Sequence, residues 1–211
     1  MPASALEVIR SLEHFVAENA KSARAFLSAV GMPRPLREIE IVEIGNASAG
    51  LLKPLRDGHS LGLVSEAGCP AIADPGALLV EAAHQEGFDV VPLIGPCSIV
   101  LALMASGLEG QRFAFCGYLP REAPARTKRI RELEQRSRAE KQTEIFIETP
   151  YRSDPLLGAL LEACSSATRL CVAANLTLAS ESIVSKTISE WRRSRAVIGR
   201  CPAVFLLEAA A

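Results

Sequence analysis

The feature that most constrains the fold is a short apolar segment followed by a loop rich in glycine and proline. Residues 61–65 (LGLVS) lie between Gly58 and Gly68, a pattern that predicts a central parallel strand buried on both faces. The loop at residues 66–76 (EAGCPAIADPG) begins directly after this segment. Because open α/β sheets bind ligands beyond the carboxyl ends of their strands, this loop is the first candidate for a binding site.

Helical and strand-like periods alternate along the rest of the chain. In the first half, the apolar spacing predicts helices at residues 4–12, 20–30, 77–86 and 97–106, strands at residues 14–17 and 89–93, and an edge strand at residues 39–44. In the second half, it predicts strands at residues 113–117, 144–148, 170–174 and 203–207, and helices at residues 121–141 and 154–164. This alternation predicts an α/β fold with a mainly parallel sheet in the first half.

A break in the apolar periodicity near residue 110 predicts a boundary between two lobes. Ser106, Gly107 and Gly110 interrupt the pattern there. A chain of 211 residues is long enough for one large α/β domain or two small ones. We therefore predict an N-terminal α/β lobe at residues 1–110 and a C-terminal α/β lobe at residues 111–211.

The composition argues against several classes of protein. A formal charge of −1 gives no attraction of the whole molecule to nucleic acid. The six cysteines include no Cys-x-x-Cys pair and have no histidine at metal-ligand spacing, so we expect reduced, mostly buried thiols and no metal site. No signal peptide pattern is present, and the longest apolar run, residues 99–105, is shorter than the ~18 residues that span a bilayer. These observations favour a cytoplasmic protein without a membrane segment.

Sequence motifs remove further alternatives. The chain contains no Gly-x-Gly-x-x-Gly after a strand, no P-loop, no Gly-x-Ser-x-Gly and no His-Glu-x-x-His. Ordinary nicotinamide dehydrogenases, P-loop NTPases, α/β-hydrolases and zinc proteases are therefore excluded as interpretations.

Three segments are candidates for ligand binding: residues 64–76, 95–98 and 148–152. Two of them follow predicted strands and one precedes a predicted helix, and they contain glycine or proline together with polar side chains. Glycines in the loop at residues 64–76 let backbone groups approach a ligand, while its prolines restrict the unfolded chain. The structural alternative is a tight connection capped by Asp74. At residues 95–98 (GPCS), Cys97 or Ser98 caps a helix, or free N–H groups bind a ligand. In ETPYR at residues 148–152, Arg152 either pairs with Glu148 or holds a substrate.

Residues 121–141 carry a local positive charge. They contain eight arginine or lysine residues and four glutamates, which suits either a solvated helix face or contact with RNA phosphates. The candidate contacts are Arg121, Arg126, Lys128 and Arg129. No aromatic side chain is interleaved with these residues to stack on bases.

Four segments occur in the order found in a known superfamily: VSEAGCPAIADPG at 64–76, GPCSIVLALMASGL at 95–108, FCGYLP at 115–120 and ETPYR at 148–152. Together they resemble the tetrapyrrole methylase superfamily over about residues 13–207. Within it they are most similar to the ribosomal RNA small-subunit methyltransferase I group, whose members methylate a cytidine ribose 2′-hydroxyl in 16S rRNA. The resemblance implies two αβα lobes, S-adenosylmethionine in the cleft between them, and a homodimer.

The resemblance also implies site residues. In the first lobe, the cofactor contacts would be Ser65, Glu66, Ala67, Gly68, Asp74, Pro96, Cys97 and Ser98. In the second lobe, they would be Gly117, Tyr118, Leu119, Pro120, Thr149 and Pro150. Tyr151 and Arg152, with Arg121, Arg126, Lys128 and Arg129, would contact an RNA substrate. Glu148 or Glu66 would accept the ribose proton, or these carboxylates would instead hold cofactor hydroxyl or ammonium groups.

The sequence departs from the superfamily pattern in three places. Family members begin with an apolar strand and a Pro/Gly loop, so the first lobe is expected to lack its usual first strand. Residues 18–21 (ENAK) replace an acidic pair followed by Thr-Arg, and residues 173–177 (AANLT) replace a more charged Arg-Glu-Leu-Thr. The alternatives are therefore a tetrapyrrole or protein methyltransferase of the same fold, or a non-catalytic module that binds S-adenosylmethionine or RNA.

Overall fold

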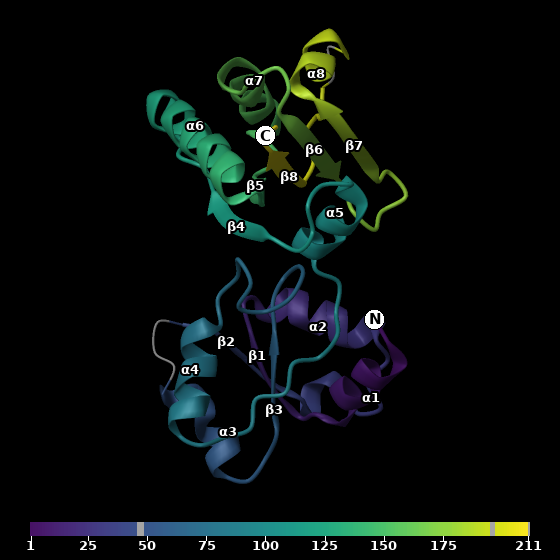
Figure 1. The fold of residues 1–211 in the computed structure, drawn as a ribbon. Coiled ribbons are helices and arrows are strands. Elements are labelled where there is room, and N and C mark those ends of the chain that lie inside the picture. Colours follow the sequence, from purple (N-terminus) through teal and green to yellow (C-terminus); the bar gives the residue numbers. More distant parts are fainter. Residues whose placement is uncertain (46–48, 195–196, 211) are drawn as a thin grey trace. The chain divides into compact units, whose positions relative to one another are not determined.

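The computed structural model describes residues 1–45, 49–194 and 197–210. It divides into two compact units, Met1–Cys97 and Ser98–Ala211 (Figure 1). Within these residues, each unit contains one β-sheet with helices packed on it. The α/β fold class predicted from the sequence is therefore confirmed.

The described part of the first unit contains a sheet in the order β2-β1-β3, in which every pairing is parallel. Its strands are β1 (His14–Ala17), β2 (Glu40–Glu43) and β3 (Leu61–Val64). This confirms the parallel sheet and the edge position of β2. It corrects the position of β3, which was predicted to be central. β3 has only β1 as a strand partner among the described residues, and its side chains are half-buried.

Helices cover both faces of this sheet. The helical elements are α1 (Ala3–Ser11), α2 (Ala20–Ala29), α3 (Lys53–Arg56) and α4 (Ala77–Gln85), with 3-10 turns η1 (Leu36–Glu38) and η2 (Ala49–Leu52). Successive residues of β1 face opposite layers. Phe15 packs with Ile9 of α1 and Leu27 of α2, whereas Val16 packs with Leu79 of α4 and Leu52 of η2. The first unit is thus an αβα sandwich, as expected.

The predicted strand at residues 89–93 is wrong, because no strand forms there. Val91 is 74% exposed and Ile94 is 73% exposed. The β-branched composition favours a strand, but a parallel strand forms only when a neighbouring strand completes its hydrogen-bond ladder. Among the described residues no strand lies on the second edge of β3.

The second unit contains a mixed sheet in the order β4-β5-β8-β6-β7 within the described residues. The strands are β4 (Phe113–Tyr118), β5 (Thr143–Glu148), β6 (Arg169–Ala174), β7 (Ser182–Thr187) and β8 (Ala203–Glu208), and the helices are α5 (Ser98–Ser106), α6 (Ala123–Glu140), α7 (Ser153–Ala163) and α8 (Ile188–Ser194). β4 and β5 are parallel, and the remaining pairings are antiparallel. β7 and α8 were not predicted, because polar and charged residues interrupt the apolar pattern of both segments.

The packing of α5 explains why the units divide before residue 98 and not near residue 110. Ile130, Leu160 and Trp191, from α6, α7 and α8, pack with Phe146 and Phe205 of the sheet. α5 instead lies against β6, β7 and β8. The helix therefore belongs to the second unit, although the glycine-rich break after it resembles a domain boundary in the sequence. None of the described helices is long and apolar enough to cross a membrane.

The cysteines are less buried than predicted. Cys164 and Cys171 are buried, whereas the other four cysteines are half-exposed. Burial raises the pKa of the Cys164 thiol to about 12 and that of the Cys171 thiol to about 11. Because the thiolate is the reactive form, we expect a maleimide at about pH 7 to leave these two thiols unmodified until the protein is denatured. Peptide mass mapping checks this, and native labelling of either at the rate of Cys69 would contradict it.

Candidate functional site

The carboxyl ends of three parallel strands bring acidic side chains together in the first unit. In the ladder, Ala17 at the end of β1 lies opposite Glu43 of β2 and Val64 of β3. Glu18 and Glu66 follow the ends of β1 and β3, and Glu66 N donates a hydrogen bond to Glu18 Oε2 at 3.1 Å. The predicted residue Glu66 therefore lies where parallel sheets place ligand-binding groups.

The start of α2 stabilises these carboxylates. Ser22 Oγ donates a hydrogen bond to Glu66 Oε1 at 2.7 Å, and Ala20 N donates to Glu43 Oε1 at 2.8 Å. The partial positive charge at a helix N-terminus favours anions in this position. Sequence reasoning missed Ser22, Glu18 and Glu43 as members of the site. For Glu18 and Glu43, the signal that would have found them was their position directly after or near the end of a predicted strand.

Asp74 is partly buried and lies near two other carboxylates. Burial is the main cause that raises the pKa of its carboxyl group, and the charges of Glu18 and Glu66 add to the increase. An interaction with the Ser65 hydroxyl lowers the pKa in the opposite direction. The Ser65 Oγ atom is nevertheless buried without a well-aligned hydrogen-bond partner among the described residues. Asp74 and Ser65 therefore lie close together in this loop, and the Ser65 hydroxyl group can still form a further hydrogen bond.

The loop after β3 has an unusual backbone. Gly68, Ala71, Ala73 and Gly76 all have positive φ, at 84°, 65°, 65° and 139°. A side chain at Gly76 would place its Cβ atom 2.9 Å from Leu63 Cδ2. Backbone in this conformation is costly for alanine and is found where function fixes it. Such a loop exposes peptide N–H and C=O groups, as a ligand-binding loop requires.

The second predicted loop of this unit contacts the first. Cys69 Sγ donates a hydrogen bond to Pro96 O at 3.6 Å. Burial, followed by the neighbouring Cys97 side chain, raises the pKa of the Cys69 thiol. The segments around Cys69 and Pro96–Cys97 therefore lie together, as the prediction for one binding site requires. Ser98 begins α5 and belongs to the second unit.

The predicted residues of the second unit also come together at one edge of a sheet. β4 and β5 are parallel, and Tyr118 lies opposite Ile147. Leu119 follows Tyr118, and its carbonyl oxygen accepts a hydrogen bond from Arg152 Nη2 at 3.4 Å. This contact links the loop that contains Gly117, Leu119 and Pro120 to the loop that contains Thr149, Pro150 and Tyr151.

Glu148 ends β5 as a buried carboxylate with one incompletely satisfied oxygen. Its Oε1 atom accepts a hydrogen bond from Thr149 N at 2.7 Å. Its Oε2 atom lies 2.7 Å from Arg152 Nη2, so the two residues form an ion pair. The alignment of this pair is not that of a hydrogen bond, and no other described donor reaches Oε2. A buried oxygen in this state favours an additional donor.

The basic segment is arranged along α6. Arg126 Nη1 donates a hydrogen bond to Arg121 O at 2.9 Å, which turns this guanidinium toward the chain. Arg129 forms an ion pair with Glu132 at 3.2 Å. Arg121 and Lys128 are exposed. A shallow hollow of about 540 Å³ lies along the helix, with Lys128 in its wall. The positive charge of α6 is therefore partly neutralised within the helix.

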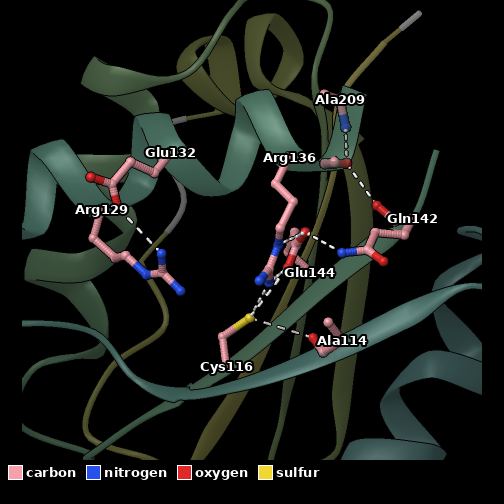
Figure 2. A network of polar contacts seen from close by, with 9 residues as sticks. Ala114, Cys116, Arg129, Glu132, Arg136, Gln142, Glu144 and Ala209 are labelled. Atoms are coloured by element: carbon pink, nitrogen blue, oxygen red, sulfur yellow. Dashed lines mark hydrogen bonds and ion pairs between the residues drawn. The ribbon is translucent and has the colours of Figure 1, made fainter. Parts of the chain in front are cut away.

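A separate ion-pair network joins α6 to the sheet (Figure 2). Arg136 Nε donates a hydrogen bond to Glu144 Oε1 at 2.8 Å, and Gln142 Nε2 donates to the same oxygen at 2.8 Å. Cys116 Sγ donates to Glu144 Oε2 at 3.2 Å. Burial, and then Glu144, raise the pKa of the Cys116 thiol to about 11. The carboxylate of Glu144 is fully buried. We therefore interpret this network as a structural one that holds α6 against β4 and β5.

The solved structures that share the fold of this chain include two methyltransferases. One is the crystal structure of the methyltransferase CobJ, which matches with a TM-score of 0.64 and 17% identity over 100% of this chain and 89% of that one. The other is the cobalt precorrin-4 methyltransferase CbiF, with a TM-score of 0.59 and 14% identity over 99% of this chain and 88% of that one. The chain thus has the same fold as these two structures.

The family assignment follows from the sequence match. The model of the family Tetrapyrrole (Corrin/Porphyrin) Methylases matches residues 1–191. The chain belongs to the tetrapyrrole methylase family, which confirms the resemblance found in its loops.

Curated relatives carry a common description. "Ribosomal RNA small subunit methyltransferase I" of Xylella fastidiosa is 35% identical over 88% of this chain and 66% of its own length. The proteins so named from Mesorhizobium japonicum and Escherichia coli O157:H7 are 33% and 32% identical, over 87% and 88% of this chain and 61% and 64% of their own lengths. The chain thus spans a little under two thirds of the length of these relatives.

Proposed function

We propose that this protein is an S-adenosylmethionine-dependent methyltransferase that acts on a ribose 2′-hydroxyl of small-subunit ribosomal RNA. The supporting observation is that its candidate loops gather at the carboxyl edge of a sheet in each unit, where α/β folds bind ligands. The relatives named as ribosomal RNA small subunit methyltransferase I, at 30–35% identity, support the choice of RNA. A ribosomal substrate would place the protein in the cytoplasm.

The loops fit a cofactor that carries hydroxyl, ammonium and carboxylate groups. Between Gly68 and Gly76, four residues have positive φ, a conformation that lets peptide groups approach a ligand. The Oε2 atom of Glu148 has no well-aligned donor among the described residues and can accept a further hydrogen bond. When bound, the cofactor supplies an electrophilic methyl group. We propose that the candidate loops hold it, and that Tyr151 and Arg152 contact the acceptor. Orientation of two reactants contributes roughly 7–11 kcal/mol to such a transfer.

The two candidate catalytic carboxylates are suited to different roles. Glu66 is exposed and engages Ser22 through one oxygen, so its other oxygen is accessible to an incoming hydroxyl group. Glu148 is buried and paired with Arg152, so it is suited to positioning that arginine. We therefore propose Glu66 as the group that accepts the ribose proton and Glu148 as a positioning residue.

The Glu66→Gln variant tests the base. An amide cannot accept the proton, so kcat for ribose methylation is expected to fall about 100-fold or more, while cofactor affinity in calorimetry changes little. Glu81→Gln, an exposed change on α4, is the matched control. An unchanged kcat in Glu66→Gln would remove this residue from the proton-transfer step.

The acceptor is identified by incubating the protein with labelled methyl donor and three substrates: isolated small subunits, free rRNA and a porphyrinogen. We expect label in small subunits or rRNA, recovered as a 2′-O-methylated nucleoside. Label in the porphyrinogen would favour the tetrapyrrole alternative, and label in ribosomal protein would favour a protein methyltransferase. Tight donor binding without transfer to any acceptor would favour a non-catalytic module. The homodimer implied by the family is measured by sedimentation of the same preparation.

A further inference from the structure

Both tyrosines of the chain are exposed at the same edge of the second sheet. The sequence contains two tyrosines, Tyr118 and Tyr151. Tyr118 ends β4 and is 57% exposed, and Tyr151 follows β5 and is 76% exposed. Since β4 and β5 are parallel neighbours, their ends lie at one edge. Tyrosine has a large apolar ring that folding or binding usually covers, so two uncovered rings at one edge indicate a contact surface.

An arginine from a distant part of the chain packs on one of these rings. The guanidinium carbon of Arg200 lies 5.6 Å from the centroid of the Tyr151 ring. β8 is antiparallel to β5, with Ala203 opposite Glu148. The start of β8 therefore lies beside the end of β5, which brings Arg200 to Tyr151. Arg200 forms no ion pair with the described residues, so a planar cation and an aromatic ring are presented together.

The charges at this edge favour stacking over simple attraction to phosphate. Arg121, Arg152 and Arg200 supply positive charge, while Glu122 and Glu148 supply negative charge. Arg152 is already paired with Glu148. The remaining excess of positive charge is small, so long-range attraction to RNA phosphates alone does not account for the exposed tyrosine ring at this edge. Unpaired RNA bases stack on aromatic rings and on arginine planes in proteins that recognise single strands.

We infer that Tyr151 and Arg200 form a stacking platform for an unpaired nucleobase of the RNA substrate. This inference rests on the proposed function and specifies how the substrate is held. The 2′-hydroxyls of an RNA duplex are alike from one nucleotide to the next, so an enzyme that acts on one nucleotide gains specificity from binding its base, or an adjacent base, in an unpaired state. Arg200 was not recognised in the sequence, because only the pairing of β5 with β8 places it near residue 151.

The test uses the full chain and a fluorescein-labelled oligocytidylate of about ten nucleotides, measured by anisotropy. Tyr151→Ala is expected to weaken binding about 10-fold and Arg200→Ala several-fold, whereas Tyr151→Phe, which keeps the ring, binds nearly as the parent protein does. Arg193→Ala, which removes an exposed charge from α8, is the control for net charge and is expected to change binding less than about 2-fold.

An oligonucleotide with abasic positions separates stacking from phosphate contacts. The parent protein is expected to bind it about 10-fold less tightly than the intact oligonucleotide, and this difference should largely disappear in Tyr151→Ala, because the two changes remove the same contact. A penalty that is the same in both proteins, unchanged binding by Tyr151→Ala, or no binding by the parent protein would overturn the platform. Circular dichroism of each variant verifies folding.

Failure of the platform and failure of the proposed function have different signatures. If the parent protein methylates ribose in small subunits but Tyr151→Ala keeps its KM and its oligonucleotide affinity, the platform is rejected and the methyltransferase stands. If no RNA is methylated but the abasic penalty depends on Tyr151, the platform stands and the assigned reaction is rejected.

Discussion

Replacement of Arg136 by methionine is expected to lower the free energy of unfolding by about 3 kcal/mol at neutral pH, the lower end of the range for breaking a buried ion pair. The reason is that Glu144 has a side chain with no exposed area, whereas Arg136 is 39% exposed. Without Arg136 the carboxylate remains buried with only Gln142 and Cys116 as donors. Urea denaturation followed by circular dichroism measures the change.

The pH dependence provides a second signature of the same network. Burial alone would raise the pKa of Glu144, but hydrogen bonds from Arg136, Gln142 and Cys116 outweigh it and hold the pKa below its ordinary value of 4.5. A carboxyl group with a lowered pKa in the folded state stabilises the protein above its unfolded pKa, and this stabilisation is lost as the pH falls. We expect Glu144→Gln to show a smaller loss of stability between about pH 5 and pH 3 than the parent protein.

Arg112→Met is the matched control for this prediction. Arg112 pairs with Glu140, but both side chains are more than half exposed, so the loss is expected to be under about 1 kcal/mol. Equal destabilisation by Arg112→Met and Arg136→Met would mean that the burial of Glu144 contributes nothing specific to stability.

Local patterns in the sequence were sufficient for most elements but not for their pairing. The strand at residues 14–17 and the helix that follows it were predicted within one or two residues, because their apolar spacing reports directly on local conformation. The central position assigned to β3 and the strand assigned to residues 89–93 were wrong, because both depend on which strand lies alongside. That information is non-local, because an apolar segment has the same sequence pattern whether or not a neighbouring strand is present in the fold.

The candidate site divides in the same way. Glu66 and Glu148 were found because each directly follows or ends an apolar strand, a position that the sequence displays. Ser22 and Arg200 were missed because their roles arise from contacts with Glu66 and Tyr151, far away in the chain. The register of the strands creates these contacts, so a single sequence gave no periodic signal for them.

Gly76→Ala is expected to lower the free energy of unfolding by about 2–4 kcal/mol, from backbone strain together with overpacking. Gly76 has φ of 139° and ψ of −23° at the start of α4. An added Cβ atom would lie 2.9 Å from Leu63 Cδ2 and 3.4 Å from Ala71 N, so either the Leu63 side chain or the candidate loop must shift. Because this loop is proposed to hold the cofactor, the affinity for S-adenosylmethionine should fall about 10-fold or more, as measured by calorimetry.

Gly58→Ala separates the effect of backbone strain from that of the steric clash with Leu63. Gly58 also has a positive φ, at 87°, but nothing lies within 4 Å of an added Cβ atom there. It follows α3, away from the candidate loops, so the change should cost about 1 kcal/mol and leave cofactor affinity unaltered. If Gly76→Ala and Gly58→Ala lower stability equally and neither alters affinity, the packing of the loop on β3 does not shape the cofactor site. A selective loss in Gly76→Ala connects one backbone conformation, held against Leu63, to ligand binding.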